Sequence, residues 1–131
     1  MSWLSRHREA QAACARLAPK FGDAATKSMA KRFEGYAMLS IEAVTAVAGG
    51  LRKPDHEDYM ATPTPADVDD ALLVVRGVRE QLLVDELALI ERARANGRSW
   101  ERIAELLDVS EAVAKARPAK LRRAIDDLNR I

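Results

Sequence analysis

Apolar residues recur at three- and four-residue spacing along most of this chain, which is the pattern of amphipathic helices. Over residues 2–17 the repeat predicts a first helix, which Pro19 and Gly22 are expected to close. A second, longer helix is predicted over residues 23–50, ending at a pair of glycines. The β-branched alternation of strands is absent. The pattern therefore predicts an all-α protein that begins with a helical hairpin.

A third helix has the clearest start in the chain. Thr64 is in the N-cap position, Pro65 occupies the first helical position, and Asp67 places a carboxylate in the first turn. The helical pattern can continue unbroken to residue 96, over about 32 residues or roughly 48 Å. A break at residues 84–86 is the alternative, and it would separate a three-helix unit at the C-terminal end.

Two apolar stripes run along this long helix. One is a heptad-like seam that only Asp85 interrupts, and the other shares the same helix. Together they exceed what a single neighbouring helix would cover, so packing within one chain and a homodimer through the long helices are equally favoured. The seam consists of Val68, Ala71, Val75, Val78, Leu82 and Leu89, and the second stripe of Leu72, Leu83, Leu87 and Ile90.

Between the second and third helices, residues 50–64 lose the helical period and indicate a linker or exposed loop. This divides the chain into residues 1–62, a helical region with a possible role in oligomerisation, and residues 63–131, the long helix with a C-terminal domain. The linker contains possible metal ligands, but adjacent residues cannot all converge on one ion, so a solvated acidic loop is expected. These residues are Asp55, His56, Glu57 and Asp58.

Residues 97–117, GRSWERIAELLDVSEAVAKAR, predict two short helices joined by a tight turn. Ser99 and Ser110 are expected as the N-caps of the two helices. Asp108 and Val109 form the turn, where aspartate is one of the few residues that adopts a left-handed backbone at modest cost. The residues predicted to face inward are Ile103, Ala104, Leu106 and Leu107 in the first helix and Val113 and Ala114 in the second.

Pro118 is expected to end or kink the second helix after about two turns. A fourth helix would then start at Pro118, with Leu121, Leu128 and either Ala124 or Ile125 on its apolar face. The sequence thus predicts a helix-turn-helix unit at the end of an all-α chain.

This C-terminal unit resembles the helix-turn-helix regions of actinobacterial regulators that are similar to region 4 of sigma factors. The resemblance covers about residues 86–117. It implies a transcriptional regulator or nucleoid-type protein that presents its second helix to the major groove of double-stranded DNA. The matching residues are Ser99, Trp100, Ile103, Ala104, Leu107, Val109 and Ser110.

The exposed face of the second helix departs from the usual pattern, because alanines stand where arginine, glutamine or asparagine would read base edges. Residues 110–125 nevertheless carry five basic residues and one acidic residue, so 5 − 1 gives a charge of +4. Contact with phosphates is favoured over a purely solvating role, because the basic run coincides with the motif. The candidate DNA-contacting residues are Arg98, Arg102, Ser110, Glu111, Lys115, Arg117, Lys120, Arg122 and Arg123.

The amino-acid composition excludes several classes of protein. The 131 residues carry a net charge of +1, so any attraction to DNA must be local. One cysteine, Cys14, and two histidines give no disulfide and no zinc site, and the longest apolar run, Ala71 to Val75, is too short to cross a membrane. A cytoplasmic protein is expected, nucleoid-associated if it binds DNA.

Neither a phosphate-binding loop nor a catalytic constellation is present, so we expect no enzyme, catalytic residue, metal or cofactor. The alternative function is a helical protein-interaction or assembly module that keeps the scaffold without sequence-specific DNA binding.

Overall fold

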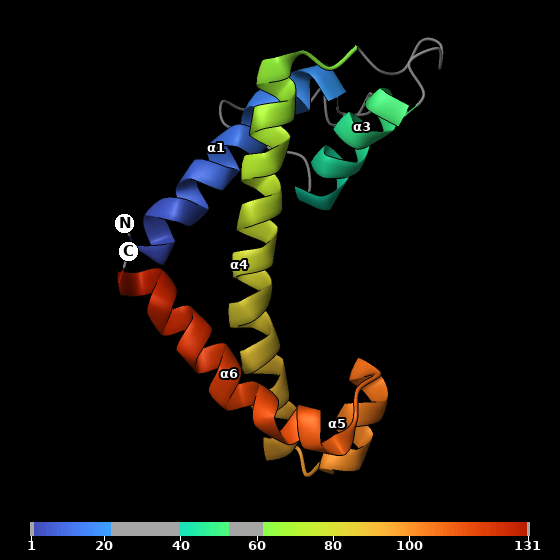
Figure 1. The fold of residues 1–131 in the computed structure, drawn as a ribbon, viewed down its shortest axis with the longest axis vertical. Helices are drawn as coiled ribbons and strands as arrows, with labels where there is room; N and C mark the ends of the chain where they lie inside the picture. Colours follow the sequence, from blue (N-terminus) through green and yellow to red (C-terminus); the bar gives the residue numbers. More distant parts are fainter. Residues whose placement is uncertain (1, 22–39, 53–61, 131) are drawn as a thin grey trace. The chain divides into compact units, whose positions relative to one another are not determined.

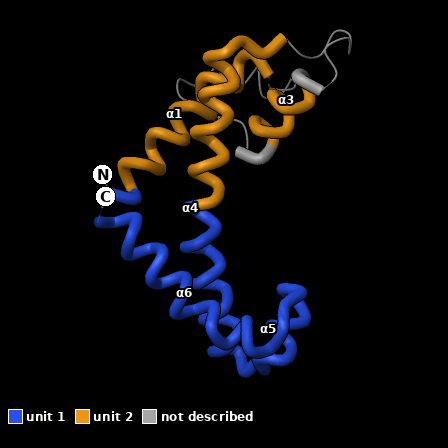
Figure 2. The backbone as a smooth tube through the Cα atoms, in the orientation of Figure 1, with its two compact units in different colours: residues 1–3, 80–131 blue, residues 4–79 orange. Residues whose placement is uncertain are grey.

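The computed structural model describes residues 2–21, 40–52 and 62–130, and these residues are almost entirely helical. Within those ranges no strand occurs, so the predicted all-α class is confirmed. The chain divides into two compact units, residues 4–79 and residues 1–3 with 80–131 (Figure 2). The helices are α1 (Trp3–Phe21), α3 (Ser40–Arg52), α4 (Pro65–Ala95), α5 (Trp100–Leu107) and α6 (Glu111–Arg130) (Figure 1).

Residues 4–79 form a core from the small and aliphatic faces of α1, α3 and the N-terminal half of α4. Leu17, Val47 and Val74 are the largest fully buried side chains in it. Three ion pairs join α1 to α4. From one pair to the next, the partner on α4 is later in the sequence and the partner on α1 is earlier, so the two helices are antiparallel. The pairs are Lys20–Asp67 at 2.5 Å, Arg16–Asp70 at 2.7 Å and Glu9–Arg76 at 2.7 Å.

One predicted helix end in this unit is wrong, and another is slightly shifted. Pro19 does not close the first helix, because α1 continues through it to Phe21. Ala18 and Phe21 are buried in the core, and their burial stabilises the extra turn despite the hydrogen bond that Pro19 cannot donate. The second predicted helix runs past its pair of glycines to Arg52, a shift within the usual variation of helix ends. Its expected start at residue 23 and the acidic cluster of residues 55–58 lie outside the described residues.

The start of α4 is confirmed. The Thr64 hydroxyl accepts a hydrogen bond from the Asp67 amide at 3.2 Å, and the Asp67 carboxylate accepts one from the Thr64 amide at 2.8 Å. This reciprocal pair satisfies two backbone donors that a helix start leaves open. The helix then continues to Ala95, and the alternative break at residues 84–86 is absent. Gly97 follows in a left-handed conformation with φ of 82°.

The two apolar stripes of α4 have different surroundings along its length. In the seam, Ala71 is buried, and Val68 and Val78 pack against the core formed with α1 and α3. Farther along, Leu82 and Leu89 of the seam are 58% and 70% exposed. The first half of the predicted seam is therefore covered by the chain itself, and only the second half is open.

In the C-terminal unit, α5 and α6 pack together and against the end of α4. The Ser99 hydroxyl accepts from the Arg102 amide at 3.1 Å, and the Ser110 hydroxyl accepts from the Val113 amide at 3.2 Å, so both predicted caps are confirmed. Asp108 has the expected left-handed backbone, with φ 55° and ψ 48°. The core consists of Ile90, Ile103, Ala104, Ala114 and Leu121, with Trp100, Leu107 and Val109 partly buried beside it.

Three predictions for this unit are wrong. Pro118 neither ends α6 nor starts a new helix, since one helix runs from Glu111 to Arg130. Ala114 before the proline and Leu121 after it belong to the same buried stripe, and the packing of that stripe outweighs the missing backbone donor. Leu106 and Val113, both expected to face inward, are 65% and 46% exposed.

Candidate nucleic-acid interface

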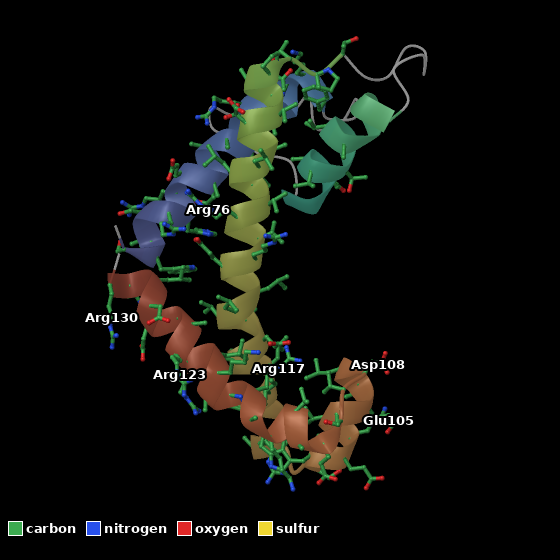
Figure 3. The ribbon with its side chains drawn as sticks, viewed as in Figure 1. Arg76, Glu105, Asp108, Arg117, Arg123 and Arg130 are labelled. Carbon is green, nitrogen blue, oxygen red and sulfur yellow. The ribbon has the colours of Figure 1, made fainter. Side chains whose placement is uncertain are left out.

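The outward face of α6 is exposed, so a second molecule can reach it. Residues on a helix turn by about 100° each, so the buried pair Ala114 and Leu121 defines the inner side of α6. Ala112, Ala116 and Arg123 lie on the opposite side and are exposed, and Arg123 points away from the unit (Figure 3). The centre of this face thus carries two small apolar side chains and one cation.

The basic residues of α6 do not form one patch. By the same helical period, Lys115 and Arg122 share one flank of the helix, and Lys120 lies on the other flank. Arg117 lies at the edge of the core, where its side chain is 30% exposed and pairs with Glu86 of α4 at 3.7 Å. The charge of +4 is therefore distributed around the helix, and Arg117 has a structural contact as well as a candidate role.

The flank with Lys115 and Arg122 borders an open cleft of about 390 Å³. Arg94 at the end of α4 and Trp100 at the start of α5 also line this cleft. The Arg94 guanidinium lies over the Trp100 ring, 4.9 Å from its centre, and donates to the Arg98 carbonyl at 2.8 Å. The cleft thus brings together cations from two helices that are separated in the sequence.

Acidic residues partly balance these cations. Lys115 pairs with Glu111 at 3.3 Å, and Arg122 pairs with Glu91 at 2.7 Å. With Arg94, three cations and two carboxylates give this side of the unit a net charge of +1. All four ion-pair side chains are about half exposed, so a phosphate can replace a carboxylate partner at small cost.

Sequence reasoning missed Arg94 and did not include Trp100 among the candidate DNA-contacting residues. In the sequence, Arg94 is one of several arginines near the C-terminal end of a helix, where positive charge complements the helix dipole. Only the fold shows that Arg94 lines the same cleft as Lys115 and Arg122. A usable signal was present, because Arg94 and Trp100 stand on either side of Gly97 and the predicted N-cap Ser99. Trp100 is half-buried and fulfils both roles, packing against the core and lining the cleft.

The remaining candidate residues lie away from this cleft or make local contacts. Arg98 is exposed in the turn before α5, and Arg102 pairs with Glu105 at 3.1 Å on the same helix. The Ser110 hydroxyl accepts a hydrogen bond from the Val113 amide and so caps α6, and its own hydrogen can still be donated to a phosphate. Glu111 lies in the first turn of α6, where it pairs with Lys115 and would repel a phosphate.

Neither a metal site nor a membrane-spanning helix is found in the part of the chain that the structure describes. In residues 2–21, 40–52 and 62–130, no three His, Cys, Asp or Glu side chains gather as metal ligands. No helix within the same ranges has the length and apolar character needed to cross a bilayer.

Comparisons with protein-family models, with curated proteins and with solved structures found no match. The resemblance of residues 86–117 to sigma region 4 therefore depends on the seven matching residues and stays a prediction. A functional proposal for this chain must rest on its own contacts and charges.

Proposed function

We propose that this protein binds double-stranded DNA through a helix-turn-helix formed by α5 and α6, as a transcriptional regulator or nucleoid-type protein. The observation that carries the proposal is the cleft beside α6, in which Arg94, Lys115 and Arg122 gather at the edge of an exposed helix. Cations on the flank of a helix that lies in the major groove face the phosphates along the groove edge. In this arrangement α6 contacts the duplex and the cleft grips the backbone.

The local backbone supports this assignment. α5 and α6 are each capped by a serine, and the left-handed residue Asp108 joins them in the short turn typical of the motif. Asp108 and Val109 donate to carbonyls of α5 at 3.2 and 3.0 Å, which closes the turn rigidly. A rigid turn presents the first turns of α6 at a fixed angle, as groove binding requires.

The composition of the outward face favours contact with phosphates over base reading. Ala112 and Ala116 offer no hydrogen bond to a base edge and can touch only a thymine methyl. Phosphate contacts supply affinity through counterion release without selecting a sequence. We therefore expect binding that depends strongly on salt and weakly on sequence.

Fluorescence anisotropy with a labelled random-sequence duplex tests the proposal. Binding is expected at about 50 mM salt and should weaken steeply as salt rises. The double variant Lys115→Ala/Arg122→Ala removes two candidate phosphate contacts, so it should weaken binding to every sequence and reduce the salt slope by about two. Arg92→Ala is the matched control, because Arg92 is exposed on α4 and does not line the cleft.

Two results would contradict DNA binding through this cleft. One is the absence of binding at low salt by a protein that circular dichroism shows to be folded. The other is an equal loss of affinity in the cleft double variant and in Arg92→Ala, since that would indicate general attraction by positive charge. A loss confined to certain sequences would overturn the assignment of Lys115 and Arg122 to phosphates.

The homodimer expected through the long helices has less support than DNA binding. Such a dimer would place two copies of α6 about 34 Å apart on successive major grooves. Val68, Ala71 and Val78 of the seam already pack within the chain, so a second copy would have to use Leu82 and Leu89. Light scattering at micromolar concentration measures the mass directly, and a monomer mass excludes the dimer.

A further inference from the structure

An open apolar groove lies between the C-terminal half of α4 and α5, within the unit of residues 80–131. We call it the leucine groove and define it by Leu82, Asp85, Glu86, Leu89 and Leu106. Its volume is about 520 Å³. The three leucines are each more than half exposed, although the core of the same unit lies directly beneath them. A monomer gains nothing from three exposed leucines around one groove, and such patches commonly mark interaction sites.

The spacing of the groove leucines suits a helical partner. Leu82 and Leu89 are one heptad apart and therefore lie on the same side of α4, while Leu106 faces them from α5. An amphipathic helix that docks in such a groove presents apolar anchors at i, i+3 or i+4, and i+7. The groove thus has two walls of leucine between which the apolar face of one further helix fits.

The charge of the groove distinguishes between possible occupants. Its charged lining residues are Asp85 and Glu86, and both are acidic. Glu86 already pairs with Arg117, whereas Asp85 accepts a hydrogen bond at 2.8 Å from the neutral amide of Gln81. Among the described residues, no cation is recorded against Asp85. Its negative charge lies between two leucine anchors and calls for a positive charge on the occupant.

A second copy of this chain fits that requirement poorly. Asp85 lies between Leu82 and Leu89, so two copies paired through these leucines would bring two Asp85 side chains to the same level. If the two α4 helices are parallel, the two Asp85 side chains lie at the same level. If the helices are antiparallel and centred between Leu82 and Leu89, Asp85 of one copy lies opposite Asp85 or Glu86 of the other. Like charges opposed in an interface are unfavourable in both arrangements.

We propose that the leucine groove binds an amphipathic helix of a different protein, one whose apolar anchors are accompanied by a lysine or arginine that pairs with Asp85. The groove and the basic cleft beside α6 are lined by different side chains apart from Ile90. Helix binding is therefore independent of DNA binding, and either can fail without the other.

The test uses two synthetic helical peptides that share leucines at i, i+3 and i+7. One carries lysines beside the leucines, and the other carries glutamates at the same positions. With fluorescently labelled peptides and the full chain, the lysine peptide should bind about tenfold more tightly than the glutamate peptide at low salt. The preference should shrink as salt rises. The charge reversal Asp85→Lys should invert it, so that the glutamate peptide binds more tightly.

Matched leucine variants locate the binding surface. Leu89→Asp should abolish binding of the lysine peptide, while Leu72→Asp should leave it unchanged. Leu72 is 63% exposed on the same helix but does not line the groove, so it controls for general apolar attraction. Both positions are exposed, and circular dichroism verifies that both variants remain helical.

Three outcomes would overturn the proposal. The first is equal affinity for the lysine and glutamate peptides, which would mean that the groove does not select by charge. The second is no binding of either peptide by the folded chain. The third is a dimer mass in light scattering that Leu89→Asp abolishes and Leu72→Asp does not, because the occupant would then be a second copy. Inversion of the preference by Asp85→Lys is the result that supports it.

Discussion

Asp67 shows how one side chain can make the stability of the unit formed by residues 4–79 depend on pH. Its carboxylate accepts hydrogen bonds from the Lys20 ammonium at 2.5 Å and from the Thr64 amide at 2.8 Å. Burial acts to raise the pKa of Asp67, but the hydrogen bonds from Lys20 and Thr64 outweigh it and hold the pKa below its ordinary value. A carboxyl with a depressed folded pKa stabilises the fold above its unfolded pKa, near 4, and this stabilisation is lost as pH falls through the folded value.

We therefore expect Asp67→Asn to lower the free energy of unfolding at pH 7, with a cost that shrinks as pH falls below about 4. Urea unfolding of the wild type and the variant at pH 7, 5 and 3 measures this difference. Asp69→Asn is the control, since Asp69 is exposed two residues away and its replacement should change stability by less than about 0.5 kcal/mol. A difference that stays constant from pH 7 to pH 3 would contradict the assignment.

Single residues were predictable from sequence where their role is local. Ser99, Ser110 and Asp108 adopt the predicted caps and turn because each acts on backbone within four residues of itself. The prediction that Leu106 faces inward was wrong. The exposure of Leu106 depends on how α4 and α5 pack together, and the helical period of α5 alone carries no information about that packing. Arg94 was missed for the same reason, since its neighbours in the cleft belong to α5 and α6.

At the scale of elements, the crossing of α1 and α4 depends on the absence of a side chain. Gly77 is buried in the interior of α4, where a glycine ordinarily costs about 1 kcal/mol relative to alanine. A Cβ added at Gly77 would collide with the Cβ of Ala10 on α1. The two helices therefore approach more closely here than any other residue at position 77 would permit.

Gly77→Ala is accordingly expected to destabilise the protein, because overpacking costs about 1 to 3 kcal/mol and exceeds the gain in helix propensity. Urea unfolding gives the change in free energy. The double variant Ala10→Gly/Gly77→Ala removes the colliding methyl and should recover part of the loss. If Gly77→Ala is as stable as the wild type, the helices can separate without cost and the close crossing is not a constraint.

Helix starts were more predictable than helix ends. The start of α4 follows from Thr64, Pro65 and Asp67, which together satisfy or remove the open donors of the first turn. The extent of α6 cannot be predicted from Pro118. An interior proline destabilises a helix, the burial of Leu121 stabilises it, and which effect is larger depends on the packing of α6 in the fold. Continuation through Pro19 in α1 has the same origin in Phe21.

For the whole molecule, α4 is the element that contributes to both cores. Val74 is buried with α1 and α3, and Ile90 is buried with α5 and α6, yet both belong to one continuous helix. The two cores share no residue. Sites without shared partners usually act independently, so a cavity in one core should leave the other intact even though the same helix enters both.

Native-state hydrogen exchange of two core variants tests this independence. Val74→Ala should cost about 2 kcal/mol and lower the protection of amides in α1 and the first half of α4, while α5 and α6 keep theirs. Ile103→Val, costing about 1 kcal/mol, should do the reverse. If Val74→Ala lowers protection equally in α5 and α6, then α4 couples the two units into one cooperative structure. If the two cores are independent, Val74→Ala should retain the DNA affinity of the wild type, because the cleft beside α6 is built only from residues of the C-terminal unit, 80–131.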